Sequence, residues 1–123
     1  MIHFDKEIRE ILSAVTNVPV LIQYPDSKAL PVIVVLETSN SVIRDRGKVT
    51  HLSVSFFVEI WDKDLNNVNY LVDVIDEKLS ELMMVRNGIT HHNSTGQYGR
   101  QLMYKCEVLY NKEDNTYTIH NNN

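Results

Sequence analysis

The chain has 123 residues, 43% of them hydrophobic, and a net charge of −4 at pH 7. This length suits a single domain over residues 1–123, whose polar end from about 111 to 123 forms a C-terminal tail. The acidic balance argues against a protein that grips nucleic acid through a basic surface. The single cysteine, Cys106, excludes an internal disulfide and a four-cysteine zinc site. The longest apolar run, Leu30–Leu36, is too short to span a membrane.

The first part of the chain has the residue spacing of a helix. Apolar residues recur at steps of three and four from Phe4 to Val15, which predicts an amphipathic helix over about Phe4–Thr16. A short strand, "VPVLIQY", follows, and then "LPVIVVLET", which is apolar on both faces. A strand of this kind is covered on both faces. One helix covers one face, so we expect another helix or another subunit over the second.

The middle of the chain combines the clearest strand with a second helix. Ser39–Lys48 is polar and is predicted to be a loop or the tip of a long hairpin. The next stretch, "VTHLSVSFFVEIW", alternates apolar and polar residues with the period of a strand. After "DKDLNN", Val68–Leu82 has helical spacing, with Asn66 or Asn67 as the expected N-cap and Asn87-Gly88 as the expected stop.

Two further strands complete the predicted fold. They lie around a glycine-containing connection in "ITHHNSTGQYGRQLMYKCEVLY". Tyr117 and Ile119 either add a short final strand or belong to the tail. The order α-β-β-β-α-β-β predicts an α+β domain, a mostly antiparallel sheet with two helices packed on one face.

The stretch "DKDLNN" raises the question of a calcium site. Asp62, Asp64 and Asn66 fit the first ligand positions of a calcium loop, and Asp73 falls at the last. The glycine and the final glutamate of such a loop are missing, and helical spacing begins inside it. We therefore expect a strand-to-helix turn whose side chains cap backbone N–H groups.

The histidines and the cysteine also favour structural roles. His91 and His92 are adjacent on a predicted strand, so their side chains point to opposite faces and cannot easily share a metal. Cys106 lies on an apolar strand face, where a cysteine behaves as a small hydrophobe. We expect no metal, no cofactor and no enzymatic activity.

The layout of the chain resembles the small tail-completion, or tail-terminator, proteins of long-tailed bacteriophages. A leading helix runs into "VPVLIQYPDSKALPVIVVLE", a long loop leads to "VSFFVEIWDKD", one helix "NVNYLVDVIDEKLSELM" follows, and "YGRQLMYKCEVLY" closes the domain. Family members often end a strand with an aromatic residue before a polar turn and carry an aromatic–arginine pair on the strand that partners the helix. Trp61-Asp62 and Tyr98…Arg100 occupy those places here. The resemblance covers about residues 4–110 and is one of layout, without a single diagnostic motif.

This resemblance implies a structural protein of the virion, assembled in the host cytoplasm, with no cofactor and no reaction. Such proteins form homo-oligomeric rings, commonly hexamers, on the tail-tube protein, and they join it to head-completion or connector proteins while DNA passes through the lumen unread. We expect partner contacts in the loops Asn40–Lys48 and Asn87–Arg100, namely at Asn40, Arg44, Arg46, Lys48, His91, His92 and Arg100. We expect subunits to pack through a second apolar sheet face formed by Ile33, Val35, Phe57 and Trp61.

Two alternatives stay open from the sequence. The basic cluster of Arg44, Arg46 and Lys48 either contacts an acidic partner or passing nucleic acid, or is a solvated hairpin tip. The whole chain is either a ring-forming neck protein or a stand-alone α+β domain that binds a small ligand or regulates a partner. Ring assembly or a metabolite-dependent melting temperature distinguishes these two functions.

Overall fold

The computed structural model describes residues 4–21, 30–94, 96–111 and 116–119. Its elements follow the predicted order, and one short strand is added near the C-terminal end. Their bounds are α1 (Phe4–Thr16), β1 (Val20–Leu21), β2 (Val32–Asp45), β3 (Lys48–Asp62), α2 (Leu65–Glu81), β4 (Val85–Ser94), β5 (Gln97–Asn111) and β6 (Thr116–Ile119). The α+β prediction is confirmed, and β6 is the final strand that the sequence left open.

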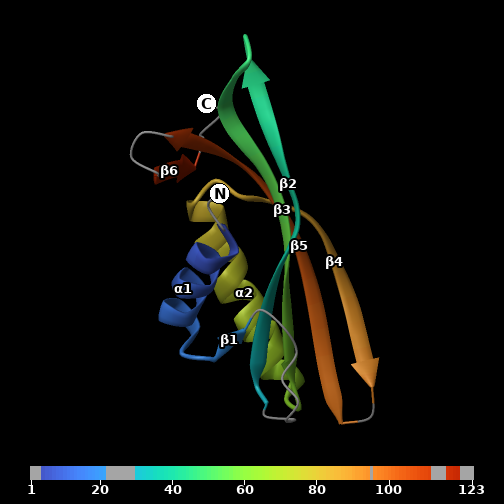
Figure 1. The fold of residues 1–123 in the computed structure, drawn as a ribbon. Coiled ribbons are helices and arrows are strands. Elements are labelled where there is room, and N and C mark those ends of the chain that lie inside the picture. Colours follow the sequence, from blue (N-terminus) through green and yellow to red (C-terminus); the bar gives the residue numbers. More distant parts are fainter. Residues whose placement is uncertain (1–3, 22–29, 95, 112–115, 120–123) are drawn as a thin grey trace.

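One sheet carries the fold. The strand order is β1-β2-β3-β5-β4, with β6 paired to β5, and β1–β2 is the parallel pair in an otherwise antiparallel sheet. Both helices lie against the same side of the sheet (Figure 1). We call this side the helix face and the other side the open face. Within the described residues, no helix or strand packs over the open face.

The hydrophobic core lies between the helix face and the two helices. Alternate residues of β3 and β5 point into it, so the period-two pattern of the sequence becomes the burial pattern of the sheet. The strands contribute Leu52, Val54, Phe56, Val58, Ile60, Leu102, Tyr104, Cys106 and Val108. The helices contribute Ile8, Leu12, Val68, Leu71, Val72, Ile75 and Leu79.

The orientation of β2 differs from our prediction. Ile33 and Val35 pair with core residues of β3, lie on the helix face and are 0% exposed. The prediction that they pack between subunits beside Phe57 and Trp61 is therefore wrong for these two residues. Their neighbours, such as Leu36, share the open face with Phe57 and Trp61 instead. Because both faces of β2 are apolar, the sequence pattern alone does not tell which face meets the helices.

Both ends of α2 also differ from the prediction. Asp64 is the N-cap, and its Oδ1 accepts a 2.9 Å hydrogen bond from the backbone N–H of Asn66, which lies inside the helix together with Asn67. At the other end, Met83 adopts the left-handed conformation, with φ 64°, in a place where glycine is usual. The predicted stop, Asn87-Gly88, lies in β4, where the pairing with β5 has a bulge.

β2 and β3 extend beyond the helices as a two-stranded arm (Figure 1). Asp45 pairs with Lys48, so Arg46-Gly47 alone makes the turn. Both turn residues have positive φ, 52° and 79°, as in the two-residue turn that suits the twist of a hairpin. The polar stretch is thus the tip of a long hairpin, the second of the two predicted alternatives.

Candidate protein-interaction surface

The open face carries an apolar row across three neighbouring strands. Leu36 of β2, Phe57 of β3 and Met103 of β5 are successive partners in the strand register. Leu36 and Phe57 are half-buried, and Met103 is 39% exposed. The row ends at Gly88 of β4, which has no side chain to cover the methionine. A contiguous apolar row on a sheet face without a helix over it is a surface suited to another protein.

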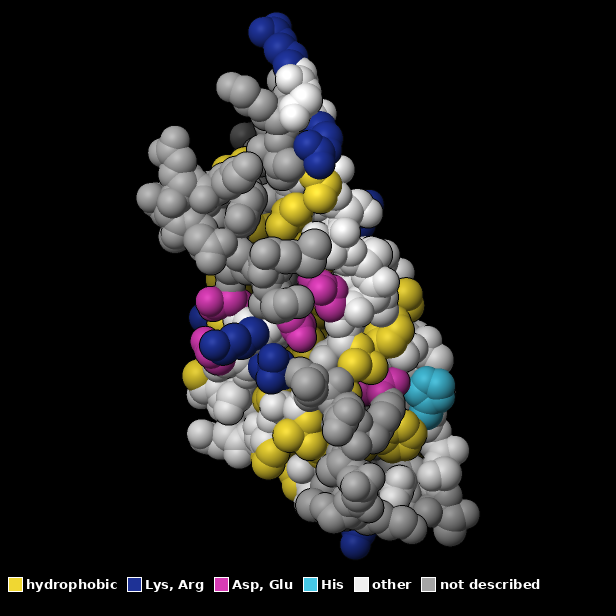
Figure 2. Space-filling view, in the orientation of Figure 1, with side chains coloured by type: hydrophobic (Ala, Val, Ile, Leu, Met, Phe, Trp, Pro, Cys, Tyr) yellow, Lys and Arg dark blue, Asp and Glu magenta, His cyan; other side chains and the backbone are white. Residues whose placement is uncertain are grey.

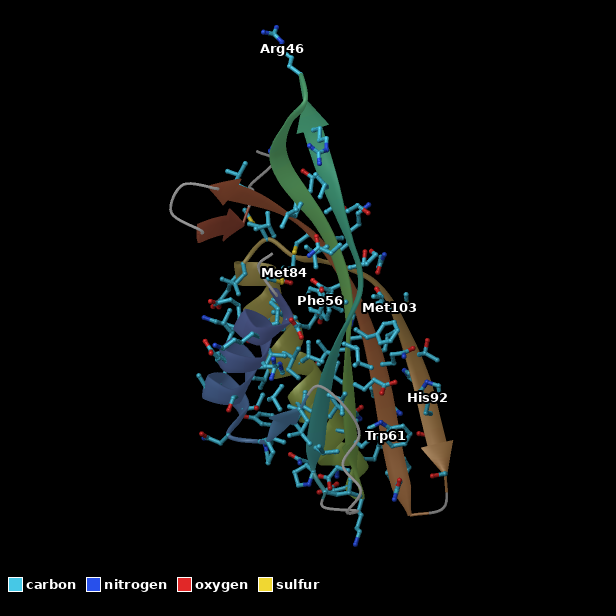
Figure 3. All side chains as sticks on the ribbon, viewed as in Figure 1. Arg46, Phe56, Trp61, Met84, His92 and Met103 are labelled. Atoms are coloured by element: carbon cyan, nitrogen blue, oxygen red, sulfur yellow. The ribbon has the colours of Figure 1, made fainter. Side chains whose placement is uncertain are left out.

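A second row of the open face contains the only tryptophan. Trp61 lies across Gly99 of β5, and its ring stacks on His92 of β4 with ring centroids 6.1 Å apart. A Cβ atom on Gly99 would lie 2.7 Å from the indole ring, so this position has room only for glycine. Figure 3 shows Trp61, His92 and Met103 away from the helices, whereas Phe56 points toward them. The indole covers the glycine across the strands and fixes its own position.

A buried carboxylate lies between the two rows. Glu59 is 7% exposed, and Gln101 Nε2 donates a 3.0 Å hydrogen bond to its Oε1. Neither Glu59 Oε2 nor Trp61 Nε1 has a hydrogen-bond partner. Burial raises the pKa of Glu59, while the Gln101 bond, the charge of His92 and the nearby indole N–H offset part of the rise. Both atoms are buried beneath the open face, and the indole N–H lies close to the Glu59 carboxylate without a well-formed hydrogen bond.

The arm holds the predicted basic cluster at its free end. Arg44 and Arg46 are exposed, and Arg44 Nη1 donates a weak 3.5 Å hydrogen bond to the backbone of the turn. The side chain of Lys48 lies outside the described part of the chain. Asn40 donates a 3.3 Å hydrogen bond to Glu37 Oε1 along β2. Arg46 marks the tip in Figure 3, and the space-filling view of Figure 2 shows basic side chains at that end.

The segment Asn87–Arg100, predicted as a partner-contacting loop, belongs mostly to β4 and β5. His91 and His92 are exposed at adjacent positions of β4 and therefore point to opposite faces, as predicted. Arg100 is buried, and its Nη1 donates hydrogen bonds of 3.0 Å to Asn93 Oδ1 and 2.8 Å to the backbone oxygen of the residue before it. The predicted partner contact of Arg100 is corrected: this side chain joins β5 to β4.

Asp62 and Cys106, which sequence reasoning weighed for chemistry, have structural roles. Asp62 accepts 2.7 Å hydrogen bonds from the backbone N–H of Lys63 and from the side chain of Asn67, so the capping interpretation of "DKDLNN" is confirmed. Burial raises the pKa of the Cys106 thiol to about 12, far from that of a reactive cysteine. In the described ranges, no group of three or more His, Cys, Asp or Glu side chains is placed to hold a metal ion.

The helical layer has less exposed apolar surface suited to a protein partner than the sheet has. Two open grooves among its described residues are lined mainly by charged residues and short side chains, among them Lys6, Glu10, Glu77 and Lys78. Tyr70 of α2 is an isolated exposed aromatic residue. No helix in the described ranges has the length and apolar character needed to cross a membrane. The candidate surface is therefore the open face, the arm and the outer edge of β4.

Sequence reasoning missed two residues that shape this surface. Glu59 stands among apolar neighbours in a strand, and its isolation in "FFVEIW" is the available signal for a buried charge. Gly99 is a glycine inside a strand, which often marks a close approach. Its partner Trp61 becomes visible only through the pairing of β3 with β5.

Comparison with known proteins assigns no family to the chain. No protein-family model matches it, and no curated protein matches it. The features that bear on the role of the chain are therefore the open face, the arm and the free edge of the sheet.

Proposed function

We propose that the protein is a structural component of a bacteriophage neck, where it forms a ring, caps the tail tube and joins the tail to the head. Its partners in this role are further copies of the chain, the tail-tube protein and the head-completion or connector proteins. DNA passes through the lumen of the ring without being read. The role requires no cofactor, no reaction and no membrane, and it places the protein in the virion.

The observation that carries the proposal is the apolar row of Leu36, Phe57 and Met103 on the open face. A subunit of a head-to-tail ring needs two different surfaces, because each copy contacts one neighbour on either side. The open face supplies an apolar surface, on which Phe57 is half-buried and Met103 is 39% exposed. The arm, which extends away from the body, supplies a second surface (Figure 1).

The charge of the chain supports the same role. A net charge of −4 suits a channel that repels the DNA backbone and lets it slide. Arg44 and Arg46 at the tip of the arm are placed to contact an acidic partner at the head or the tail tube.

The test combines the purified chain with tail tubes of the phage or prophage that encodes it. We expect a ring of six 14.3-kDa chains, about 86 kDa, seen by sedimentation velocity or as a cap on tube ends in electron micrographs. Met103→Glu introduces a charge into the apolar row and should abolish the ring and the cap. Tyr70→Glu introduces the same charge on the exposed surface of α2 and should leave both intact.

Two results would overturn the proposal. One is a chain that stays monomeric and leaves tube ends uncapped at every concentration tested. The other is a monomer whose melting temperature rises with a metabolite, because that behaviour defines the small-ligand-binding alternative.

A further inference from the structure

β4 is an edge strand without the usual protection. It pairs with β5 on one side, and within the described residues no strand lies on its other side. After the bulge at Asn87, Gly88–Ser94 contains no charged residue and no proline, the devices that normally keep edge strands from pairing. Nearly every residue of the strand is exposed, including the apolar Ile89 at 40%.

The opposite edge of the sheet has a second stretch of the same kind. β1 covers only Ile33 and Val34 of β2, so the outer side of Ser39–Val42 faces no described strand. This stretch also follows a bulge, lacks charge and proline, and carries an exposed apolar residue, Val42 at 44%. The two edges therefore match in character and belong to the two ends of the strand order β1-β2-β3-β5-β4.

We propose that Ile89–His92 of one copy pairs with the outer edge of Ser39–Val42, at the base of the arm of a second copy, and that Ile89 lies opposite Val42. β4 runs antiparallel to β2 within the sheet, so a second copy added at this edge keeps the antiparallel alternation. Ile89 pairs with Leu102 and Val42 with Leu52, which places both side chains on the helix face. The two exposed apolar residues then cover each other, which stabilises the pairing.

The same register completes the apolar row of the open face. The residue opposite Gly88 becomes Ile43 of the second copy, an exposed residue on the open face of the arm. Gly88 leaves open the side of Met103 that faces β4, where a Cβ on the glycine would only touch the sulfur at 3.7 Å. Ile43 of the neighbour fills the position that Gly88 leaves empty. One contact thus gives hydrogen-bond partners to the free backbone groups of β4 and covers Met103 at the exposed end of the row.

This inference rests on the proposed ring, because arm-to-edge pairing joins two different surfaces and passes from copy to copy. Pairing of β4 with a second β4 would close a dimer and leave the arm without a partner. A disulfide between strands requires Cβ atoms about 3.5–4.5 Å apart, so it reports both the pairing and the register.

The experiment traps the contact with the double variant Val42→Cys/Ile89→Cys, oxidised in the full-length chain with and without tail tubes. We expect a ladder of covalent oligomers on a non-reducing gel. Each single variant should run as a monomer on the same gel, because it has no second thiol at the contact. The matched control, Ile43→Cys/Ile89→Cys, puts the two thiols on opposite faces and should give no ladder. The native Cys106 is buried and does not interfere.

Each remaining outcome overturns the inference in a recognisable way. An 86-kDa ring without the ladder keeps the proposed function and refutes the arm-to-edge contact. A covalent dimer from Ile89→Cys alone indicates β4-to-β4 pairing. If neither a ring nor a ladder forms, with or without tube ends, both proposals are refuted. Both sites are solvent-exposed, and Trp61 fluorescence during urea unfolding verifies that every variant is folded.

Discussion

Two consecutive phenylalanines show how differently the two faces of one sheet are built. Phe56 on the helix face is 1% exposed and stacks on Tyr104, with ring centroids 5.6 Å apart. Phe57 on the open face is half-buried in a row that ends at an exposed methionine. One side of the strand is closed by the chain's own helices. The other side is buried at Val32 and Val34 but leaves Phe57 half-buried and Met103 39% exposed, and this exposed part is the physical basis for expecting a partner.

The polar groups on the two faces differ in the same way. On the helix face, the Tyr104 hydroxyl donates a 2.9 Å hydrogen bond to Asp76, and Arg100 has two acceptors. On the open face, one oxygen of Glu59 and the indole N–H of Trp61 have none. Within the sheet, the unpaired buried side-chain atoms of the described residues therefore lie on the open face, whereas α1 has two more, Asp5 Oδ1 and Arg9 Nε.

The largest expected effect comes from exchanging each phenylalanine for alanine. Phe56→Ala removes a fully buried ring and should lower the free energy of unfolding by about 3–5 kcal/mol. Phe57→Ala should lower it by only about 1 kcal/mol, because water already reaches that side. Urea unfolding followed by Trp61 fluorescence measures both. Equal losses would show that the open face is as well packed as the core, and the contrast between the faces would disappear.

The sequence predicts this contrast for β3 but not for β2. In β3 the apolar face is marked by serines and a histidine on the other side, so its orientation follows from periodicity. In β2, Val32–Leu36 is apolar at every position, and the assignment of Ile33 and Val35 to the outer face was wrong. Only the register with β3 orients it.

Turn chemistry explains the other differences between sequence and structure. Asp64 displaces Asn66 and Asn67 as the N-cap because a carboxylate at the last extended residue accepts the first free backbone N–H. Glycine is the usual signal for a helix end, yet Met83 takes the left-handed conformation here. The interaction surface depends on which strands form the edges, and pairing between distant segments decides that.

The second largest effect is expected at Gly99, where the open face is tightly packed. Gly99→Ala places a methyl group 2.7 Å from the Trp61 ring and should destabilise the protein by about 1–3 kcal/mol as the ring is displaced. Trp61 is the only tryptophan, so its emission wavelength should shift with the same substitution. Gly88→Ala is the matched control on β4, because its new methyl group meets Met103 at an ordinary 3.7 Å. An unchanged spectrum for Gly99→Ala would contradict the stacked arrangement.

A smaller effect is expected from removing the hydrogen bond between Tyr104 and Asp76 on the helix face. Burial and the hydrogen bond to Asp76 both raise the pKa of Tyr104, so its hydroxyl stays protonated and donates throughout the physiological range. Tyr104→Phe keeps the ring and should cost about 1.5 kcal/mol, because Asp76 loses its donor. Arg86, 3.7 Å from the same carboxylate, limits the loss. In Asp76→Asn the same exchange at Tyr104 should cost less, and a double-mutant cycle of unfolding free energies measures the difference.

The smallest effect concerns the pH dependence of the open face. Because burial raises the pKa of Glu59, the folded state holds this proton more tightly than the unfolded chain does. The stability that the group contributes is complete below the ordinary glutamate pKa of 4.5 and is lost as pH rises through the higher folded-state pKa. Glu59→Gln keeps an oxygen for the Gln101 hydrogen bond but does not titrate. Its stability should therefore match the wild type at low pH and exceed it at pH 7.

Glu10→Gln, on the exposed side of α1, controls for the change in net charge. A Glu59→Gln protein less stable than the wild type at pH 7 would mean that the charged carboxylate has a donor on the open face, and the contrast in polar pairing between the two faces would then fail.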